Sequence, residues 1–231
     1  MIFADYFVSN DYYYFTYDAT ANGLSEGSNQ KGLVQGVKDL DKAISCVKAN
    51  EKLKDYPIML LGHSWGGYSV SSVLKMHPDV KAVCSLSGFN SALDLMSSNA
   101  KKKVGSFLTN ASLPYLKLYE RFVFGNSYKL HAIDGFNSSN CNVLIIHSSD
   151  DNVIDMDYGY NKYYELYHDN PRFKFIKYSN KAHGYMFLND EARIMVENYY
   201  NKKGSFDKDL YINGLDLDMF NQILDLFNNY S

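Results

Sequence analysis

The stretch from Pro57 to Gly67 constrains the fold more than any other part of the chain. It begins with the apolar run P-I-M-L-L at 57–61 and continues directly into G-H-S-W-G-G at 62–67. Such an apolar run is typical of a strand buried on both faces of a parallel sheet. Apolar residues then recur at helical spacing up to Met76, and Pro78 is expected to end that helix. We therefore predict a strand, a tight turn and a helix.

The turn itself carries the pattern G-x-S-x-G, which between a strand and a helix is typical of a nucleophile elbow. Small residues are expected two positions to either side of Ser64, because the backbone turns sharply there. A serine hydroxyl is a poor nucleophile until a neighbouring base takes its proton. The backbone N–H of Trp65 would face a developing oxyanion. A glycine-rich turn without chemistry is the alternative interpretation, so the rest of the chain must supply an acid and a base.

A candidate acid follows a later strand. The β-branched, apolar run at 142–146 ends in a polar stretch that contains two aspartates. Open α/β sheets place their sites at the carboxyl ends of the strands. Asp151 is the preferred acid, because four residues separate it from the predicted strand end and the apolar pair 153–154 follows it. Asp150 is the alternative.

His183 is the candidate base. It follows an alternating strand at 173–178 and precedes Gly184, which is expected to let the backbone turn the imidazole inward. An ordinary loop histidine is the alternative. Among the other histidines, His63 and His147 are expected to line the site. His77 and His168 are expected to lie at exposed helix ends.

The chain order Ser64, Asp151, His183 is the order of the catalytic triad in α/β-hydrolases. A second motif lies at 17–27, Y-D-A-T-A-N-G-L-S-E-G. It is similar to the family pattern D-x-R-G-x-G-x-S-x-G, although Thr20 and Ala21 stand where the pattern has Arg and Gly. On these motifs the chain resembles the α/β-hydrolase superfamily, and within it the bacterial esterase and serine-aminopeptidase-like group.

The resemblance implies hydrolysis of an ester or amide without a cofactor. Ser64 would be the nucleophile, His183 the general base and then acid, and Asp151 the carboxylate that orients the imidazole. A carboxylesterase acting on small or medium acyl esters is the preferred function. An aminopeptidase or acylpeptide-type peptidase is the runner-up. It would need a site for a charged amino terminus, and an Asp or Glu in the cap would mark it. An inactive scaffold is the third interpretation.

Predicted strands and helices alternate along the chain, which indicates an α/β fold with a doubly wound, mostly parallel sheet. Residues 1–10 are expected to form the last part of a helix. The predicted strands lie at 11–17, 57–61, 80–86, 143–147 and 173–178, and the main helices at 31–53, 65–76, 158–168, 191–200 and 217–230.

The gap between the predicted strands at 80–86 and 143–147 is too long for a simple crossover. We expect residues 1–89 and 141–231 to form the core, and residues 90–140 to form a helical cap insertion with helices at 93–103 and 113–122. The resemblance implies that Phe89, Tyr115 and Tyr119, with His63, shape a substrate pocket. The alternative is that these aromatic residues form a small core of the cap.

The resemblance also implies an element that is missing before Asp18. Related hydrolases carry a strand that ends in His-Gly and supplies a second oxyanion donor, whereas only seventeen residues precede Asp18 here. Three explanations are open: an incomplete chain, a shortened and inactive hydrolase, or a substitute amide in the loop from Ala19 to Gly23. We favour the first. An uncovered sheet edge would then favour aggregation or a homodimer.

Composition limits the classes of partner that the protein is expected to bind. The net charge is −3 and the longest basic run is the lysine triplet at 101–103, which argues against nucleic acid as the main partner. No signal peptide or run of transmembrane length is present, so we expect a cytoplasmic protein without a membrane partner and with a small-molecule substrate. No Cys/His cluster has zinc spacing, and no metal is expected. Cys46, Cys84 and Cys141 are expected to be buried, reduced thiols.

Overall fold

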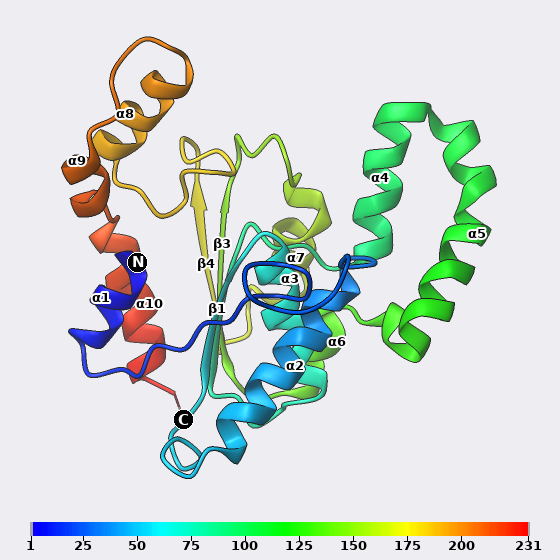
Figure 1. The fold of residues 1–231 in the computed structure, drawn as a ribbon, viewed down its shortest axis with the longest axis horizontal. Helices are drawn as coiled ribbons and strands as arrows, with labels where there is room; N and C mark the ends of the chain where they lie inside the picture. Colours follow the sequence, from blue (N-terminus) through cyan, green and yellow to red (C-terminus); the bar gives the residue numbers. More distant parts are fainter. Residues whose placement is uncertain (1, 231) are drawn as a thin grey trace.

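The computed structural model describes residues 2–230, which fold around a four-stranded parallel sheet (Figure 1). Because parallel neighbours need long crossovers, helices connect the strands. The register places Met59 opposite Ala82, Ala82 opposite Asn142, and Val143 opposite Phe173. In sheet order the strands are β1 (Met59–His63), β2 (Ala82–Leu86), β3 (Asn142–Ser148) and β4 (Phe173–Tyr178).

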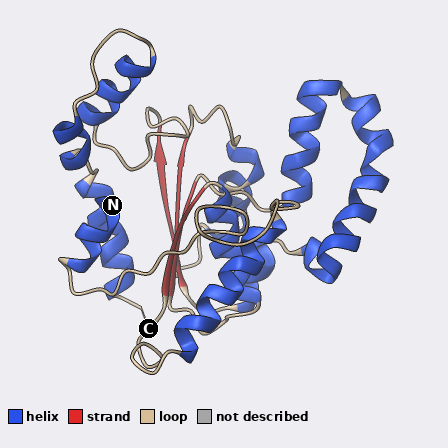
Figure 2. Ribbon diagram, in the orientation of Figure 1, coloured by secondary structure: helices blue, strands red, loops and turns tan. Residues whose placement is uncertain are grey.

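Helices cover both faces of the sheet, as Figure 2 shows, and the predicted doubly wound fold is confirmed. One face carries α2 (Val34–Ala49), α3 (Trp65–Ser72), α6 (Ala132–Ser138) and α7 (Tyr160–Tyr167). The other face carries α1 (Ile2–Val8) and α10 (Leu217–Asn228). Away from these lie α4 (Ala92–Val104), α5 (Ser106–Phe124), α8 (Asp190–Tyr200) and α9 (Lys208–Asn213), with short 3-10 turns η1 (Val73–Lys75), η2 (Gly125–Lys129) and η3 (Met156–Tyr158).

The sheet has an apolar core on each face. Side chains alternate along each strand, so that Val143 and Ile145 of β3 belong to the core on the side of α2, α3, α6 and α7, whereas Leu144 and Ile146 belong to the core on the side of α10. All four side chains are buried. Burial on both faces explains why the central strands are continuous apolar runs.

The predicted strand at 11–17 is not present. Residues 12–19 run as an irregular extended segment, and β1 pairs with β2 alone among the described strands. Other differences are smaller: the helix that follows Ser64 ends as η1, and α6 and α9 were not predicted. Helix α6 is short and packs very closely, because a Cβ on Gly135 would lie 2.0 Å from Ser71 O.

Helices α4 and α5 form a hairpin that stands away from the sheet (Figure 1). They cover the two helices predicted for the cap insertion, and the division of the chain into core and cap stays a prediction. Within the part of the chain that the structure describes, no helix is long and apolar enough to cross a membrane. The cysteines are all free, and Cys84 and Cys141 are buried, but Cys46 is exposed on α2, contrary to prediction.

Candidate active site

The turn between β1 and α3 forces Ser64 into an unusual backbone conformation. Its φ is 58° and its ψ is −116°, a region that non-glycine residues rarely occupy. The backbone N–H of Ser64 donates to Leu86 O at 2.8 Å, which fixes the turn to β2. A Cβ on Gly62 would lie 2.3 Å from Gly66 O, so glycine is required there.

The requirement for small residues is not symmetric, however. A Cβ on Gly66 would meet nothing within 4 Å, whereas one on Gly67 would lie 2.9 Å from the Cα of Gly88. The prediction that a small residue is needed two positions after Ser64 is therefore wrong. Glycine is needed instead at position 67, where α3 approaches the loop after β2 closely.

Ser64, His183 and Asp151 lie in one chain of contacts. Ser64 Oγ is 2.9 Å from His183 Nε2, and His183 Nδ1 is 2.7 Å from Asp151 Oδ2. A carboxylate only accepts hydrogen bonds, so these partners assign the proton to Nδ1 and leave Nε2 to accept from the serine hydroxyl. The arrangement can move a proton from Ser64 to His183 while a negative charge stabilises the imidazolium.

Asp151 is held as a buried carboxylate. Its side chain is 0% exposed, Oδ1 accepts from the N–H groups of Val153 and Ile154, and Oδ2 lies 3.3 Å from His147 Nε2. Burial raises the pKa of Asp151, but the hydrogen bonds from His147, His183 and the two backbone groups outweigh it and hold that pKa well below its usual range. The carboxylate is therefore ionised at neutral pH.

Asp150 lies in a different position. Its Oδ1 accepts from Ser148 Oγ and from the N–H of Ala182, so it braces the loop that carries His183. Strand β3 extends to Ser148, and only two residues separate its end from Asp151, not the four that were predicted. The left-handed residue beside His183 is also not the predicted Gly184 but Ala182, with φ 43°.

His63 contacts the backbone of His183. Its Nε2 is 2.9 Å from His183 O, and a carbonyl only accepts, so Nε2 carries the proton. The two imidazole rings are 4.8 Å apart. Burial, and next the charge of His183, lower the pKa of His63 to about 4. His63 is therefore a neutral donor at neutral pH and holds the main chain of His183 in place.

The remaining predicted histidines are distributed differently. His147 is buried and contacts Asp151 and Ile154 O, so it supports the carboxylate and not the serine. His77 is also buried, contrary to prediction, because Asp41 and Lys48 of α2 contact its ring nitrogens at 3.0 and 3.1 Å. His168 is exposed, as predicted.

Of the three aromatic residues expected to shape a pocket, one lies in the core and two lie on α5. Phe89 is 1% exposed and stacks on Tyr68 within the core at 4.8 Å between centroids. Tyr115 is 75% exposed on α5, and the hydroxyl of Tyr119 donates to Lys31 O. A part for these three residues in a substrate pocket stays a prediction.

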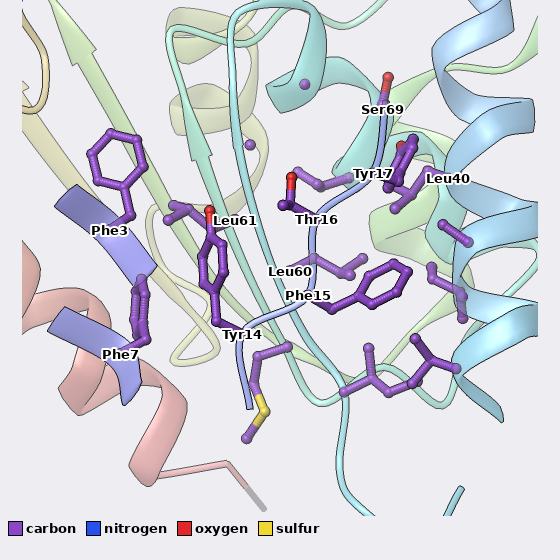
Figure 3. Close-up of a pocket in the computed structure, with 18 of the residues that line it drawn as sticks. Phe3, Phe7, Tyr14, Phe15, Thr16, Tyr17, Leu40, Leu60, Leu61 and Ser69 are labelled. Carbon is purple, nitrogen blue, oxygen red and sulfur yellow. The ribbon is translucent and has the colours of Figure 1, made fainter. Parts of the chain in front are cut away.

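Trp65 begins α3, and the first N–H groups of a helix have no partner within it. Its backbone N–H is therefore available beside Ser64, while its indole Nε1 donates to Leu33 O. Trp65, His63 and Gly66 also line an apolar cavity of about 570 Å³ along β1 (Figure 3), which the sequence did not reveal. The second oxyanion donor stays a prediction.

Acid should destabilise the protein partly through His63. In the unfolded chain, His63 takes up a proton as the pH falls through its ordinary pKa of about 6.5. In the folded protein, it takes up this proton only when the pH falls to its lowered pKa of about 4. The folded state therefore binds fewer protons in that window, and the free energy of unfolding falls as pH falls, by at most roughly 3 kcal/mol. In His63→Gln this contribution disappears. Urea unfolding of both proteins at pH 7 and 4.5 measures it, and an equal loss in both would contradict the assignment.

Comparison with known proteins gives a family match. Residues 2–134, more than half of the chain, match the model of the family described as serine aminopeptidase, S33. A search of curated protein sequences found no match.

Solved structures add a likeness in fold. Two structures of an esterase from Pyrococcus furiosus have TM-scores of 0.53 and 0.51 at 18% and 19% identity, and the match covers 80% of this chain and 68% or 66% of the esterase. Dipeptidyl peptidase 4 of Porphyromonas gingivalis has a TM-score of 0.47 at 18% identity, over 74% of this chain and 22% of that one. At 18% and 19% identity, the likeness to the esterase concerns the fold alone.

Proposed function

Because this chain belongs to the serine aminopeptidase, S33, family of α/β-hydrolases, we propose that it is a serine hydrolase that cleaves a carboxylic ester. The observation that carries the proposal is the contact chain from Ser64 Oγ to His183 Nε2 at 2.9 Å and from His183 Nδ1 to Asp151 Oδ2 at 2.7 Å. The strained backbone of Ser64 adds support, because such conformations persist mainly where function needs them.

The proposed reaction has two halves. Ser64 Oγ attacks the carbonyl carbon of the ester and gives its proton to His183 Nε2, while the Trp65 N–H donates to the oxyanion. The tetrahedral intermediate then expels the alcohol, which takes the proton from His183 and leaves an acyl group on Ser64. Water, deprotonated by His183, attacks that acyl group and releases the acid. Asp151 stays ionised throughout and stabilises the imidazolium.

An ester is favoured over an amide by the chemistry of the leaving group. An alkoxide leaves more readily than an amine, so ester cleavage makes the smaller demand on stabilisation of the intermediate. The N–H of Trp65 lies beside Ser64 by its position at the start of α3 and can donate to the oxyanion. Each such donor contributes roughly 3 kcal/mol.

A second candidate function, an aminopeptidase, has one observation in its favour. Glu120 of α5 is 0% exposed, and no described residue forms a hydrogen bond with either of its carboxylate oxygens. Burial raises the pKa of this carboxyl group. A substrate ammonium group would supply the missing partner, as expected of an acidic residue that recognises a charged amino terminus.

A substrate panel separates the two candidates. We expect p-nitrophenyl acetate and butyrate to be cleaved with kcat/KM at least roughly tenfold above that for aminoacyl p-nitroanilides, which is about 1.4 kcal/mol in transition-state free energy. Preference for anilides with a free amino group, lost in Glu120→Gln but not for N-acetylated anilides, would instead establish the aminopeptidase. Folded protein that cleaves none of them would support the scaffold interpretation.

A further inference from the structure

A buried lysine lies two residues before His183. Lys181 is 3% exposed, and it is the only buried lysine in the part of the chain that the structure describes. Its Nζ atom lies 2.7 Å from Asp216 Oδ2 and also donates to Leu188 O. The ring of Tyr178 lies on another side, with its centroid 5.4 Å from Nζ. A carboxylate, a carbonyl and an aromatic face therefore enclose an ammonium group that the proposed reaction does not use.

Stability alone does not account for this buried ion pair. Lysine is almost never fully buried unless it is paired. A buried ion pair contributes little net stability, because the desolvation of both charges offsets their attraction, and apolar side chains of similar volume often serve a core as well. What the pair adds is direction, because an ammonium group that donates to a fixed carboxylate and a fixed carbonyl is held in one position relative to both.

Asp216 is itself held firmly, because it belongs to α10. It is the N-cap residue of that helix, where its Oδ1 accepts from the Met219 N–H at 3.1 Å, and its own N–H donates to Phe187 O at 2.9 Å. Helix α10 packs on the sheet through buried apolar side chains, namely those of Met219, Phe220, Ile223, Leu226 and Phe227. Lys181 therefore connects the loop that carries His183 to a helix packed on the sheet.

The backbone around Lys181 is fixed from the side of the sheet. The N–H of Lys181 donates at 3.1 Å to Ser148 Oγ, at the end of β3, and the N–H of Ala182 donates at 2.9 Å to Asp150 Oδ1. Ala182 has a φ of 43°, a left-handed conformation that persists only where the surrounding structure holds it. These bonds, together with the ion pair of Lys181, set the direction in which the chain reaches His183.

We propose that Lys181 is a positioning residue for His183, and this inference rests on the proposed hydrolysis. Its ion pair with Asp216 holds the loop so that the imidazole keeps two contacts at once, 2.9 Å to Ser64 Oγ and 2.7 Å to Asp151 Oδ2. A displacement of about 1 Å in such a contact can slow a reaction roughly a hundredfold. Because protein groups enclose the ammonium, loss of the pair should lower kcat and leave KM nearly unchanged.

A double variant separates position from stability. Lys181→Met removes the ammonium group and Asp216→Asn removes the charge of its partner, while the asparagine oxygen can still accept from the first turn of α10. No charge is then left unpaired in the interior, so the double variant should unfold at a higher temperature than either single variant. We expect its KM for a p-nitrophenyl ester to stay within about twofold of the wild-type value, but its kcat to fall at least roughly tenfold.

Lys48→Met combined with Asp79→Asn is the matched control. This pair has the same distance of 2.7 Å between Nζ and a carboxylate oxygen, and it joins α2 to the loop before β2. The two charges removed are the same, but the loop of His183 is not involved. Its kcat should therefore equal that of the wild type.

Proton NMR tests the position of His183 without any substrate. A proton held in a charge-assisted bond between His183 Nδ1 and Asp151 Oδ2 resonates far downfield, and its disappearance in Asp151→Asn assigns the signal. We expect the signal in the wild type and in the control variant, and its loss or broadening in the double variant. That loss supports the inference even if the wild type cleaves no ester, so the two proposals can fail separately.

Asp216→Asn alone tests the same contact if the double variant does not fold, because it keeps both the cap of α10 and the bond from Lys181 to Leu188 O. It should also lose or broaden the far-downfield signal. An unchanged signal in a folded variant that lacks the ion pair, or a kcat that recovers together with stability in the double variant, would overturn the proposal.

Discussion

Ser64→Ala is expected to abolish labelling by a fluorophosphonate probe and to lower kcat for a p-nitrophenyl ester by roughly four to six orders of magnitude. The probe reacts with a serine only when a base activates it, and His183 Nε2 lies 2.9 Å from the Ser64 hydroxyl. Replacement by alanine removes the atom that attacks the ester in the proposed mechanism. The residual rate would come from binding and from the N–H of Trp65.

The fold of this variant should be unchanged. Alanine meets the same unfavourable φ as serine, and the backbone bond to Leu86 O does not involve the side chain. Ser45→Ala, on the exposed part of α2, is the matched control and should keep full labelling. Mass spectrometry of the labelled wild type should map the adduct to Ser64. Labelling that persists in Ser64→Ala, or folded wild type that does not react, would contradict the proposed mechanism.

The sequence predicted those parts of the fold that depend on local pattern. The strand at 173–178 was placed at its observed bounds, because aromatic and β-branched residues fill it and Pro171 and the polar pair 179–180 flank it. The turn at Ser64 could be predicted because glycine is needed at position 62 to avoid a clash with Gly66 O, which lies within the same motif. The family resemblance, the parallel sheet and the hydrolase class are confirmed by the structure and the family match.

Features that depend on distant partners could not be predicted in this way. The segment at 11–17 is rich in aromatic residues, as many strands are, but strand formation also needs a hydrogen-bonding neighbour that no local pattern reveals. His77 looked like an exposed helix end because its contact, Asp41, lies 36 residues away. The direction of the hairpin that carries Tyr115 and Tyr119 was also beyond the reach of any local pattern.

A second large loss of activity is expected when the acid is replaced. Sequence spacing did not decide whether that acid is Asp150 or Asp151. Asp151→Asn is expected to lower kcat roughly ten-thousandfold with little change in fold. An asparagine NH2 group facing His183 Nδ1 would favour the tautomer with the proton on Nε2, which then could not accept the proton of Ser64. The asparagine oxygen can still accept from the Val153 and Ile154 N–H groups, so the loop should survive.

Asp150→Asn is the matched control, one residue away and isosteric. Its oxygen can still accept from the Ser148 hydroxyl and the Ala182 N–H, so kcat should fall no more than about tenfold, the range expected when a supporting contact is weakened. Steady-state kinetics with one ester, alongside thermal unfolding of each variant, separates the two effects. A larger loss in Asp150→Asn would move the acid to Asp150 and would require the loop at 149–154 to rearrange when substrate binds, because the 2.7 Å contact with His183 belongs to Asp151.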